Sequence, residues 1–324
     1  MYDYARRAQT GFVNCHVGIA RRDEFAGNSP GTHDLGDGGA QVMSFLAPQF
    51  NGVSLPEGRT LLMGIVNVTP DSFSDGGKWF ATDRAVSRGL ELVSQGADII
   101  DVGGESTRPN SKRISASEEI SRIVDVVRAL VGEGVVVSVD TVHAATAQAM
   151  CEAAGAHIIN DVSGACWDPQ MARVMAETDA VCIIQHWRGL PGAPDEDILE
   201  TGSVDTVLGE LDRQVEAVLA AGVKPERIVL DPGLGFAKTM EANWQLLGGL
   251  DEMIARCPFP FLIGHSRKRF IKGCADELAD VDELTVALTA LIAKWRPWAV
   301  RVHEARGNLA ALRAAEQWNR ASVK

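Results

Sequence analysis

From Leu61 onward the chain repeats one pattern, in which a short apolar run is followed by a polar loop and then by a longer amphipathic stretch. The apolar runs are rich in Val and Ile and are bounded by turn residues, which is typical of strands covered on both faces. We expect strands at 61–67, 97–103, 135–141, 157–163, 180–186, 227–233, 261–266 and 299–304. The amphipathic stretches predict helices, among them 83–96, 115–134, 205–222 and 284–295.

This alternation predicts an α/β fold of the closed (β/α)8 TIM-barrel type over residues 59–324, because eight strand–helix units leave no unit to cover an open edge. Residues 1–58 show weak periodicity and contain the Gly-, Asp- and Ser-rich stretch 27–41. Such a segment cannot bury enough apolar surface to offset its ordering entropy. We therefore expect a flexible N-terminal extension at 1–58, with Met43 as an alternative start.

Each expected strand ends in a polar or charged side chain, and these are Asn67, Asp101, Asp140, Asn160, His186, Asp231, Ser266 and His303. In a barrel of parallel strands these ends meet at one mouth, so the pattern predicts a polar bowl above an apolar plug. Barrel enzymes hold their reacting groups there. For Asp101 and His186 a simple capping or turn-forming role is an equally good interpretation.

One side of the bowl is basic, because a closed barrel places the ends of strands 7, 8 and 1 side by side. They carry Ser266, Arg267, Lys268, Arg301, His303 and Asn67. Arg301 and His303 are two positions apart on one strand, so both side chains are expected to face the interior. The cluster predicts an anion site, and pairing of Arg301 with a carboxylate is the alternative.

The opposite side of the bowl is acidic and carries Asp140, Asn160 and Asp231. These residues could ligate magnesium. However, Asn both donates and accepts hydrogen bonds, and a carboxylate accepts two parallel N–H bonds, so the set favours a flat heterocycle with a 2-amino-pyrimidinone edge. Two loops that are long for strand–helix connections, 68–78 and 103–113, predict lids or binding loops over this site.

Composition narrows the class of protein. The 324 residues carry a formal charge of −12, which argues against a nucleic-acid partner. No apolar stretch approaches the roughly 20 residues that cross a bilayer. The six cysteines form no CxxC pair, so free thiols are expected. The N-terminus has no apolar core of a signal peptide, which indicates a cytoplasmic protein without a membrane partner.

The ordered motifs resemble those of the dihydropteroate synthase family, a group of pterin-binding barrel enzymes. The motifs are "GIVNVTPDSFSDGG", "IIDVGGESTRP", "VSVDT", "IINDVSG", "LDPGLGFAKT", "GHSRKRF" and "VRVH", and they span roughly residues 60–304. Each is modest on its own, whereas the ordered set is specific. The resemblance implies a transferase of folate biosynthesis that joins 6-hydroxymethyl-7,8-dihydropterin pyrophosphate to p-aminobenzoate, with release of pyrophosphate, and that is a sulfonamide target.

The resemblance also implies a role for each part of the bowl. The pterin contacts match Asp140, Asn160, Asp231 and Lys268. The pyrophosphate contacts match Asn67, Ser266, Arg301, His303 and Arg108, with Asn67 also meeting Mg²⁺. The p-aminobenzoate site matches Thr107, Arg108, Pro109, Phe73, Gly235, Phe236, Lys268 and Ser266. The expected catalytic residues are Asp140, Lys268, Arg301 and His303.

The implied mechanism is dissociative, with Mg²⁺ as cofactor and a homodimer as the expected assembly. Three alternatives stay open: a non-catalytic pterin-binding paralogue, a corrinoid-class pterin methyltransferase, and a Schiff-base aldolase that uses Lys268. The basic neighbours of Lys268 in the sequence argue against the last. The chain departs from the family pattern at Gln185, where Met is commoner, and at Glu304, where Asp is commoner; Gln185 is expected at the floor of the pterin pocket, and Glu304 is expected to face away.

Overall fold

The computed structural model describes residues 48, 50, 52–69, 78–106, 113–190, 192–193, 196–276 and 279–322, without the side chains of 78–80. All of them belong to one compact unit, Gln41–Lys324. The expected flexible extension lies outside the described residues up to position 47, so its flexibility and the division at 58/59 stay predictions.

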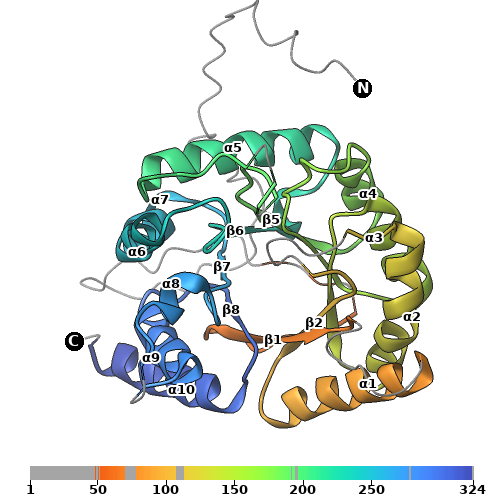
Figure 1. Cartoon of the computed structure of the whole chain (residues 1–324), viewed down its shortest axis with the longest axis horizontal. Coiled ribbons are helices and arrows are strands. Elements are labelled where there is room, and N and C mark those ends of the chain that lie inside the picture. The colour runs from red at the N-terminus through yellow and green to blue at the C-terminus, as the bar shows by residue number, and fades with distance from the viewer. Residues whose placement is uncertain are drawn as a thin grey trace, which may run out of the picture. The chain divides into compact units, whose positions relative to one another are not determined.

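Eight parallel strands form the inner ring of the fold, in the spatial order β6-β5-β4-β3-β2-β1-β8-β7 (Figure 1). A single bridge between Leu230 and Phe261 joins β6 to the chain entering β7, and so closes the ring. The (β/α)8 barrel is thereby confirmed. The strands are β1 (Leu61–Asn67), β2 (Ile99–Gly103), β3 (Val136–Asp140), β4 (Ile158–Asp161), β5 (Val181–Gln185), β6 (Ile228–Asp231), β7 (Leu262–Ile263) and β8 (Ala299–Val302).

All eight expected strands are present, but β7 is much shorter than the expected 261–266. The chain leaves the sheet at Gly264 and turns through Arg267, whose φ of 57° lies in the left-handed region. Extended pairing cannot continue through that conformation. Ser266 and Lys268 therefore sit in a loop above the sheet rather than on a strand.

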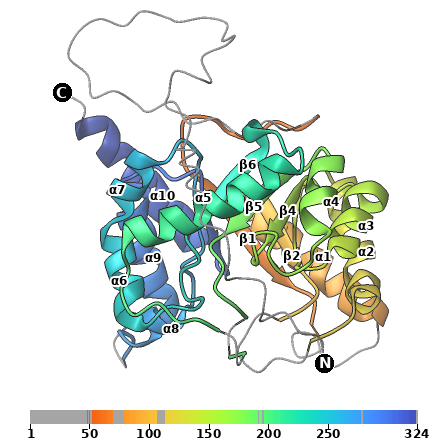
Figure 2. The same cartoon turned by 90° about the horizontal axis from the view of Figure 1, so that it is seen from above.

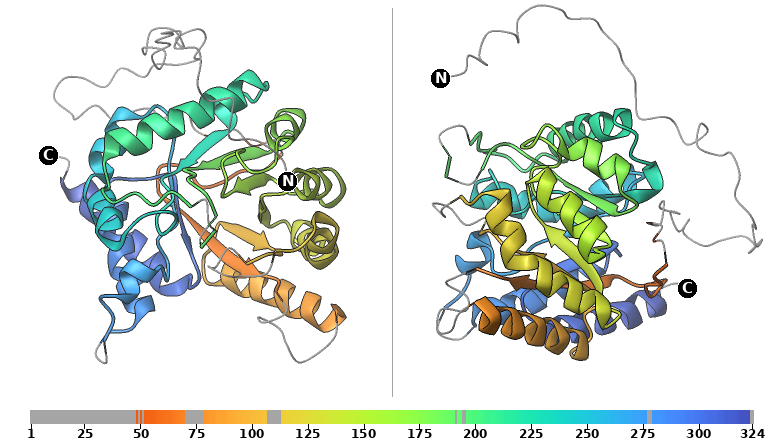
Figure 3. Two further views of the ribbon diagram at one scale, coloured as in Figure 1. Left: turned by 45° about the horizontal axis from the view of Figure 1, so that its top comes forward. Right: turned by 90° about the vertical axis from the view of Figure 1, so that its right-hand side faces the viewer.

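The helices surround the strand ring on its outer side (Figures 2 and 3). Polar N-caps start several of them: the side chains of Ser115, Ser203 and Thr239 accept the first free N–H groups of α2, α5 and α6, and Asp280 forms a capping box on α9. The helices are α1 (Lys78–Ser94), α2 (Ala116–Gly132), α3 (Ala144–Ala154), α4 (Met171–Glu177), α5 (Val204–Ala220), η2 (Pro225–Arg227), α6 (Met240–Gly248), α7 (Leu250–Arg256), α8 (Arg269–Lys272), α9 (Val281–Ala293) and α10 (Arg306–Ser322).

The two faces of each strand build two separate apolar clusters, because successive side chains of a strand point to opposite faces. Outward residues such as Leu62 and Ile100 pack under the helices. Inward residues form a plug at the base of the barrel, which comprises Leu61, Met63, Ile99, Val136, Ile158, Val181, Ile183, Val229, Leu262 and Ala299. Phe50, Val53, Leu55 and Trp298 pack against this plug from below.

The same alternation decides which polar side chains enter the barrel. Residues two or four positions beyond a plug residue on the same strand share its inward direction. These inward polar residues are Asn67, Asp101, Ser138, Asp140, Asn160, Gln185, Asp231, Arg301 and His303. His186 follows the inward Gln185 and therefore points outward, so the interpretation of His186 as a wall of the bowl was wrong.

Two further findings concern the cysteines and the helices of the described part of the chain. Its five cysteines, Cys151, Cys166, Cys182, Cys257 and Cys274, are free thiols. None of its helices combines the length and the apolar character that a bilayer span requires.

We expect Ile99→Ala to lower the free energy of unfolding by about 2–4 kcal/mol, because it leaves a cavity in a plug where Ile99 is fully buried. Urea denaturation followed by circular dichroism measures this change. The matched control is Ile198→Ala at a side chain that is 48% exposed, which should change stability by about 0.5 kcal/mol or less. Equal effects of the two changes would contradict the plug.

Candidate active site at the barrel mouth

The centre of the mouth is an ion triad. Arg301 donates from Nε to Asp101 Oδ2 and from Nη2 to Asp140 Oδ2, and both distances are 2.6 Å. Asn160 Nδ2 also donates to Asp101 Oδ2, at 3.1 Å. Carboxylate pairing was the alternative interpretation of Arg301, and it is what the structure shows. The basic and acidic sides of the mouth therefore touch each other instead of facing one another across a gap.

The triad is short of positive charge, since one guanidinium serves two carboxylates. Burial raises the pKa of Asp140 to about 7; Arg301 opposes this shift, while Asp101 and Glu119 add to it. Asp101 is fully buried, and its Oδ1 has no partner in the described structure. The site thus holds an unused acceptor and a carboxylate that is poised to change its charge near neutral pH.

A second group connects strand β6 to the loop after β7. Burial lowers the pKa of Lys268 to about 8, and Arg301 lowers it further, whereas Asp231 and Asp140 raise it. The Nζ of Lys268 lies 4.0 Å from the centre of the Phe236 ring, a cation–π contact. Asp231 is buried, which raises its pKa, and its Oδ1 accepts the backbone N–H of Gly233 at 2.7 Å.

Gly235 is required by this contact. Its φ is +77°, and a Cβ at this position would lie 2.7 Å from Cδ of Lys268. The missing side chain lets Lys268 lie across the loop and reach Phe236. The role of Gly235 in the p-aminobenzoate site stays a prediction.

Neutral hydrogen-bonding groups complete the mouth beside β1 and β8. Ser266 Oγ lies 3.0 Å from His303 Nδ1. Burial, with Arg301, Arg267 and Lys268 nearby, lowers the pKa of His303 to about 3, so its imidazole is neutral at physiological pH. Asn67 ends β1 next to Gly103 and is partly exposed. These residues offer hydrogen bonds to an anion without adding charge of their own.

Known proteins share both the sequence pattern and the fold. The family model "Pterin binding enzyme" matches residues 63–303. A dihydropteroate synthase of Mycobacterium leprae is 42% identical over 265 residues, which cover 79% of this chain and 93% of the relative.

The chain belongs to the pterin-binding enzyme family.

Two solved structures extend the likeness to the fold of this family. The Xanthomonas albilineans dihydropteroate synthase with 4-aminobenzoic acid has a TM-score of 0.73 and 34% identity, covering 82% of this chain and 94% of that one. The Anaplasma phagocytophilum dihydropteroate synthase with 6-hydroxymethylpterin-monophosphate has a TM-score of 0.72 and 32% identity, covering 80% and 99%.

The structure gathers the described members of the predicted site at one mouth. Electrostatic contacts join Arg301, Lys268 and Asp231, which come from three different strand ends. The other described members are Asn67, Asp140, Asn160, Gly235, Phe236, Ser266 and His303. Phe73, Thr107, Arg108 and Pro109 lie outside the described residues, and their roles stay predictions.

The expected basic surroundings of Lys268 need correction. Arg267 pairs with Asp282 on α9, with both of its bonds at 2.7 Å, and so turns away from the mouth. Burial lowers the pKa of His265 to about 4, and its ring contacts Thr289 on α9. Lys268 instead meets the Phe236 ring, two carboxylates and the guanidinium of Arg301. Sequence neighbours were a poor guide here because this loop turns sharply at Arg267.

Asp101 is a site residue and not a simple cap, because it anchors Arg301 inside the barrel. Strand alternation could have identified it, because Ile99 belongs to the interior plug and Asp101 is two positions further on.

The two departures from the family pattern occupy different places. Gln185 faces inward in register with Asp231 and donates from Nε2 to the carbonyl of Val162 at 3.0 Å. Glu304 accepts the backbone N–H groups of Arg306 and Gly307 at the start of α10, so it caps a helix. The prediction that Glu304 faces away from the site is therefore correct.

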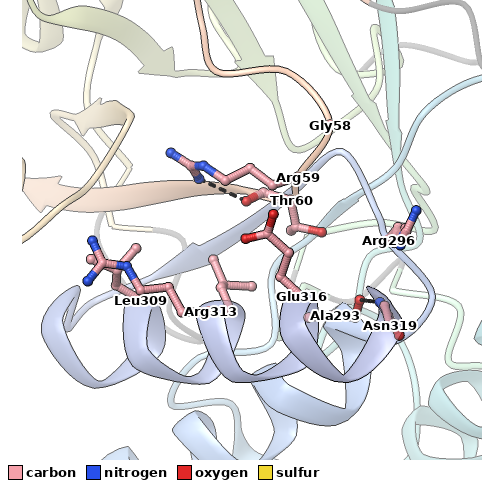
Figure 4. Close-up of a pocket in the computed structure, with 10 residues that line it drawn as sticks. Gly58, Arg59, Thr60, Ala293, Arg296, Leu309, Arg313, Glu316 and Asn319 are labelled. Carbon is pink, nitrogen blue, oxygen red and sulfur yellow. Dashed lines mark hydrogen bonds between the residues drawn. The ribbon is translucent and has the colours of Figure 1, made fainter. Parts of the chain in front are cut away.

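A separate hollow of about 180 Å³ lies near the other end of the barrel (Figure 4). Its wall includes Arg59 and Thr60, which directly precede β1, together with Arg313 and Glu316 of α10. Arg59 is held by Asp98 through two bonds of 2.9 and 2.6 Å. Because the functional loops of a barrel follow the carboxyl ends of its strands, this hollow is not part of the site.

The raised pKa of Asp140 predicts a pH-dependent cost to stability. The folded pKa of about 7 lies above the unfolded value of 3.8, so the folded state binds this proton more tightly. The contribution of Asp140 to the free energy of unfolding should fall as the pH rises from about 4 to about 7, and Asp140→Asn should abolish that fall. Urea midpoints of both proteins across this range measure the difference.

The control for this titration is Asp125→Asn on the surface of α2, whose stability curve should run parallel to that of the wild type. A constant difference between wild type and Asp140→Asn over the whole range would contradict the assignment.

Proposed function

We propose that the protein is a dihydropteroate synthase, a transferase that joins 6-hydroxymethyl-7,8-dihydropterin pyrophosphate to p-aminobenzoate in folate biosynthesis. The observation that carries this proposal is the convergence of Asp140, Asn160, Asp231, Lys268 and Arg301 at one barrel mouth. The relatives that carry this activity name match nearly their whole length.

The pterin-binding part of the proposed site comprises Asp140, Asn160, Asp231 and Lys268. The carboxylates and the amide oxygen can accept the N–H groups of a 2-amino-pyrimidinone edge, and the amide or ammonium nitrogen can donate to its carbonyl. Each charge-assisted bond contributes about 1.5–3 kcal/mol, which is enough to orient the ring. Gln185 lies at the same height in the barrel and would border the pterin.

The pyrophosphate-binding part comprises Arg301, His303, Ser266 and Asn67, with Arg108 as a further predicted contact. Of the five N–H donors of its guanidinium, Arg301 uses one at Nε to bind Asp101 and one at Nη2 to bind Asp140. Its remaining donors can meet phosphate oxygens.

Magnesium is part of this proposal, with Asn67 as its only expected protein ligand. The described residues contain no group of three or more His, Cys, Asp or Glu that could hold a metal. An amide oxygen alone suits an ion that is held mainly by phosphate oxygens and water. When bound, such an ion supplies positive charge that stabilises the leaving pyrophosphate.

The p-aminobenzoate-binding part would lie at Phe236, Gly235, Lys268 and Ser266, with Thr107, Arg108, Pro109 and Phe73 as predicted contacts. Phe236 offers an aromatic face, and Lys268 offers a cation for the carboxylate. A sulfonamide, as an aniline of similar shape, would compete for the same place.

In the proposed reaction the C–O bond between the pterin methylene and pyrophosphate breaks first, and its electron pair leaves with pyrophosphate. The aniline nitrogen then attacks the methylene cation and loses a proton to water. Arg301 stabilises charge on the leaving group, while ionised Asp140 stabilises the cation. No strong base is required, because the aniline attacks an electrophile that has already formed.

The alternatives are less well supported. A corrinoid-class methyltransferase has no use for the cationic leaving-group contacts at Arg301. A Schiff-base aldolase could use Lys268, whose lowered pKa suits a nucleophile. However, Lys268 lies against Phe236 with two carboxylates nearby, which also explains a purely electrostatic role. A non-catalytic paralogue would bind the pterin without releasing pyrophosphate.

We further propose a cytoplasmic homodimer that acts on small molecules and binds neither nucleic acid nor membrane. The exposed apolar residues Leu291 and Trp295 near the end of α9, and Trp318 on α10, support pairing through these helices.

The decisive test is pyrophosphate release from the dihydropterin substrate. We expect release to require both p-aminobenzoate and Mg²⁺, with dihydropteroate as the product detected by chromatography. Binding of the pterin without release would favour a non-catalytic paralogue, and release with no dihydropteroate formed in the presence of p-aminobenzoate would contradict the synthase reaction.

Asp140→Ala should fold but lose turnover, because it removes the carboxylate that would face the methylene cation. Circular dichroism and the pyrophosphate assay together test this prediction. An unfolded variant, or one with full activity, would refute the assigned role.

Lys268→Ala should raise the KM for both substrates, each by about tenfold, since this residue is proposed to contact both. The matched control is Lys272→Ala, at an exposed lysine one turn further along the chain. Unchanged KM values in the first variant would show that Lys268 is misplaced.

A further inference from the structure

A second buried lysine, Lys238, takes no part in the proposed reaction. It follows Phe236 in the loop between β6 and α6 and is 8% exposed. Its Nζ donates to the carbonyls of Gly233 at 3.0 Å and Phe236 at 3.3 Å, and it lies 3.0 Å from His186 Nδ1. These three partners match the three donors of an ammonium group.

The contact with His186 fixes the state of that ring. Burial, with Lys238 and Arg188 nearby, lowers the pKa of His186 to about 2, so the imidazole is neutral. Because Nδ1 accepts from Lys238, the proton is on Nε2, which donates to Glu210 at 2.8 Å. Glu210 also accepts from Arg188 at 2.7 Å. The buried ammonium is thereby linked to a carboxylate on α5.

The loop that Lys238 holds has an unusual backbone. Gly233, Gly235 and Ala237 all have left-handed φ values, of 68°, 77° and 43°. Such a loop keeps its shape only where its surroundings enforce it. Asn243 provides a second tie, since its Oδ1 accepts the Gly235 N–H at 2.6 Å. Leu199 provides a third, because its N–H donates to the Ala237 carbonyl at 2.9 Å.

What this loop presents to the mouth is the pair Gly235 and Phe236. Phe236 packs with Val142 and Val162 and carries the ammonium of Lys268 over its ring. The carbonyl of Phe236 is one of the two that Lys238 binds. A shift of this carbonyl would therefore displace the aromatic ring relative to Lys268.

We propose that Lys238 is a positioning residue for the p-aminobenzoate-binding part of the site, because it holds Gly235 and Phe236 in place against Lys268. This inference rests on the proposed function. Lys238 acts through the loop and does not itself touch the substrate. His186 and Glu210 anchor it from β5 and α5.

The test compares Lys238→Met with Arg227→Met. Arg227 is a matched control because it is also a buried cation that binds backbone carbonyls, those of Met175, Thr178 and Ala180, near the base of the barrel. Both variants should lose stability. Only Lys238→Met should raise the KM for p-aminobenzoate, by about tenfold, with a much smaller change in the KM for the pterin substrate and in kcat.

A second readout is amide hydrogen exchange in residues 232–239, which should speed up in Lys238→Met alone. A milder variant, Glu210→Gln, removes the distant charge and should raise the same KM in the same direction to a smaller extent. It keeps the proposal testable if Lys238→Met does not fold.

Two results would overturn the inference: equal changes of both KM values in Lys238→Met and Arg227→Met, or an unchanged p-aminobenzoate KM in Lys238→Met and in Glu210→Gln. These results are distinguishable from failure of the proposed function, in which the wild-type protein itself would form no dihydropteroate.

Discussion

One guanidinium between two carboxylates governs the mouth of this barrel. Arg301, Asp101 and Asp140 come from three strands and are largely buried, so each would be costly to keep charged without the others. Removing Arg301 would leave two like charges together. Removing either carboxylate would free guanidinium donors inside the barrel. The triad therefore keeps a charged site folded in the absence of substrate, and it leaves one negative charge in excess, ready for a cationic group.

The strand alternation places this triad. Inward positions are apolar at the base and polar above it, so one periodicity supplies both the plug and the site. The plug gives rigid support directly beneath the reactive groups. Loops after β6 and β7 then add Phe236 and Lys268 from the side. Lys238 holds the first of these loops and is linked to α5 through His186. The rigid half and the loop-built half of the mouth thus have different structural origins.

The sequence was sufficient to predict the barrel, its eight strands and most inward side chains, because these depend on local periodicity. Asp140, Asn160 and Asp231 were found in this way. The alternation of side chains along a strand also predicts that Gln185 points inward and His186 outward. The partner of Arg301 was not predictable, since Asp101 is 200 positions away and its pairing depends on three-dimensional closure. The surroundings of Lys268 were also missed, because the sharp turn at Arg267 reverses the direction that neighbouring residues suggest.

The closure of the ring has a consequence for motion. Between β6 and β7 the sheet is joined by one bridge, Leu230–Phe261, and β7 itself is only Leu262–Ile263. Asp231 stands on one side of this seam, and the Lys268 loop follows on the other. With so few shared backbone hydrogen bonds, this seam is the part of the ring that separates at the lowest cost in free energy. The Phe236 ring and the Lys268 ammonium follow the strands on its two sides, so their contact spans the part of the ring that the fewest backbone hydrogen bonds hold.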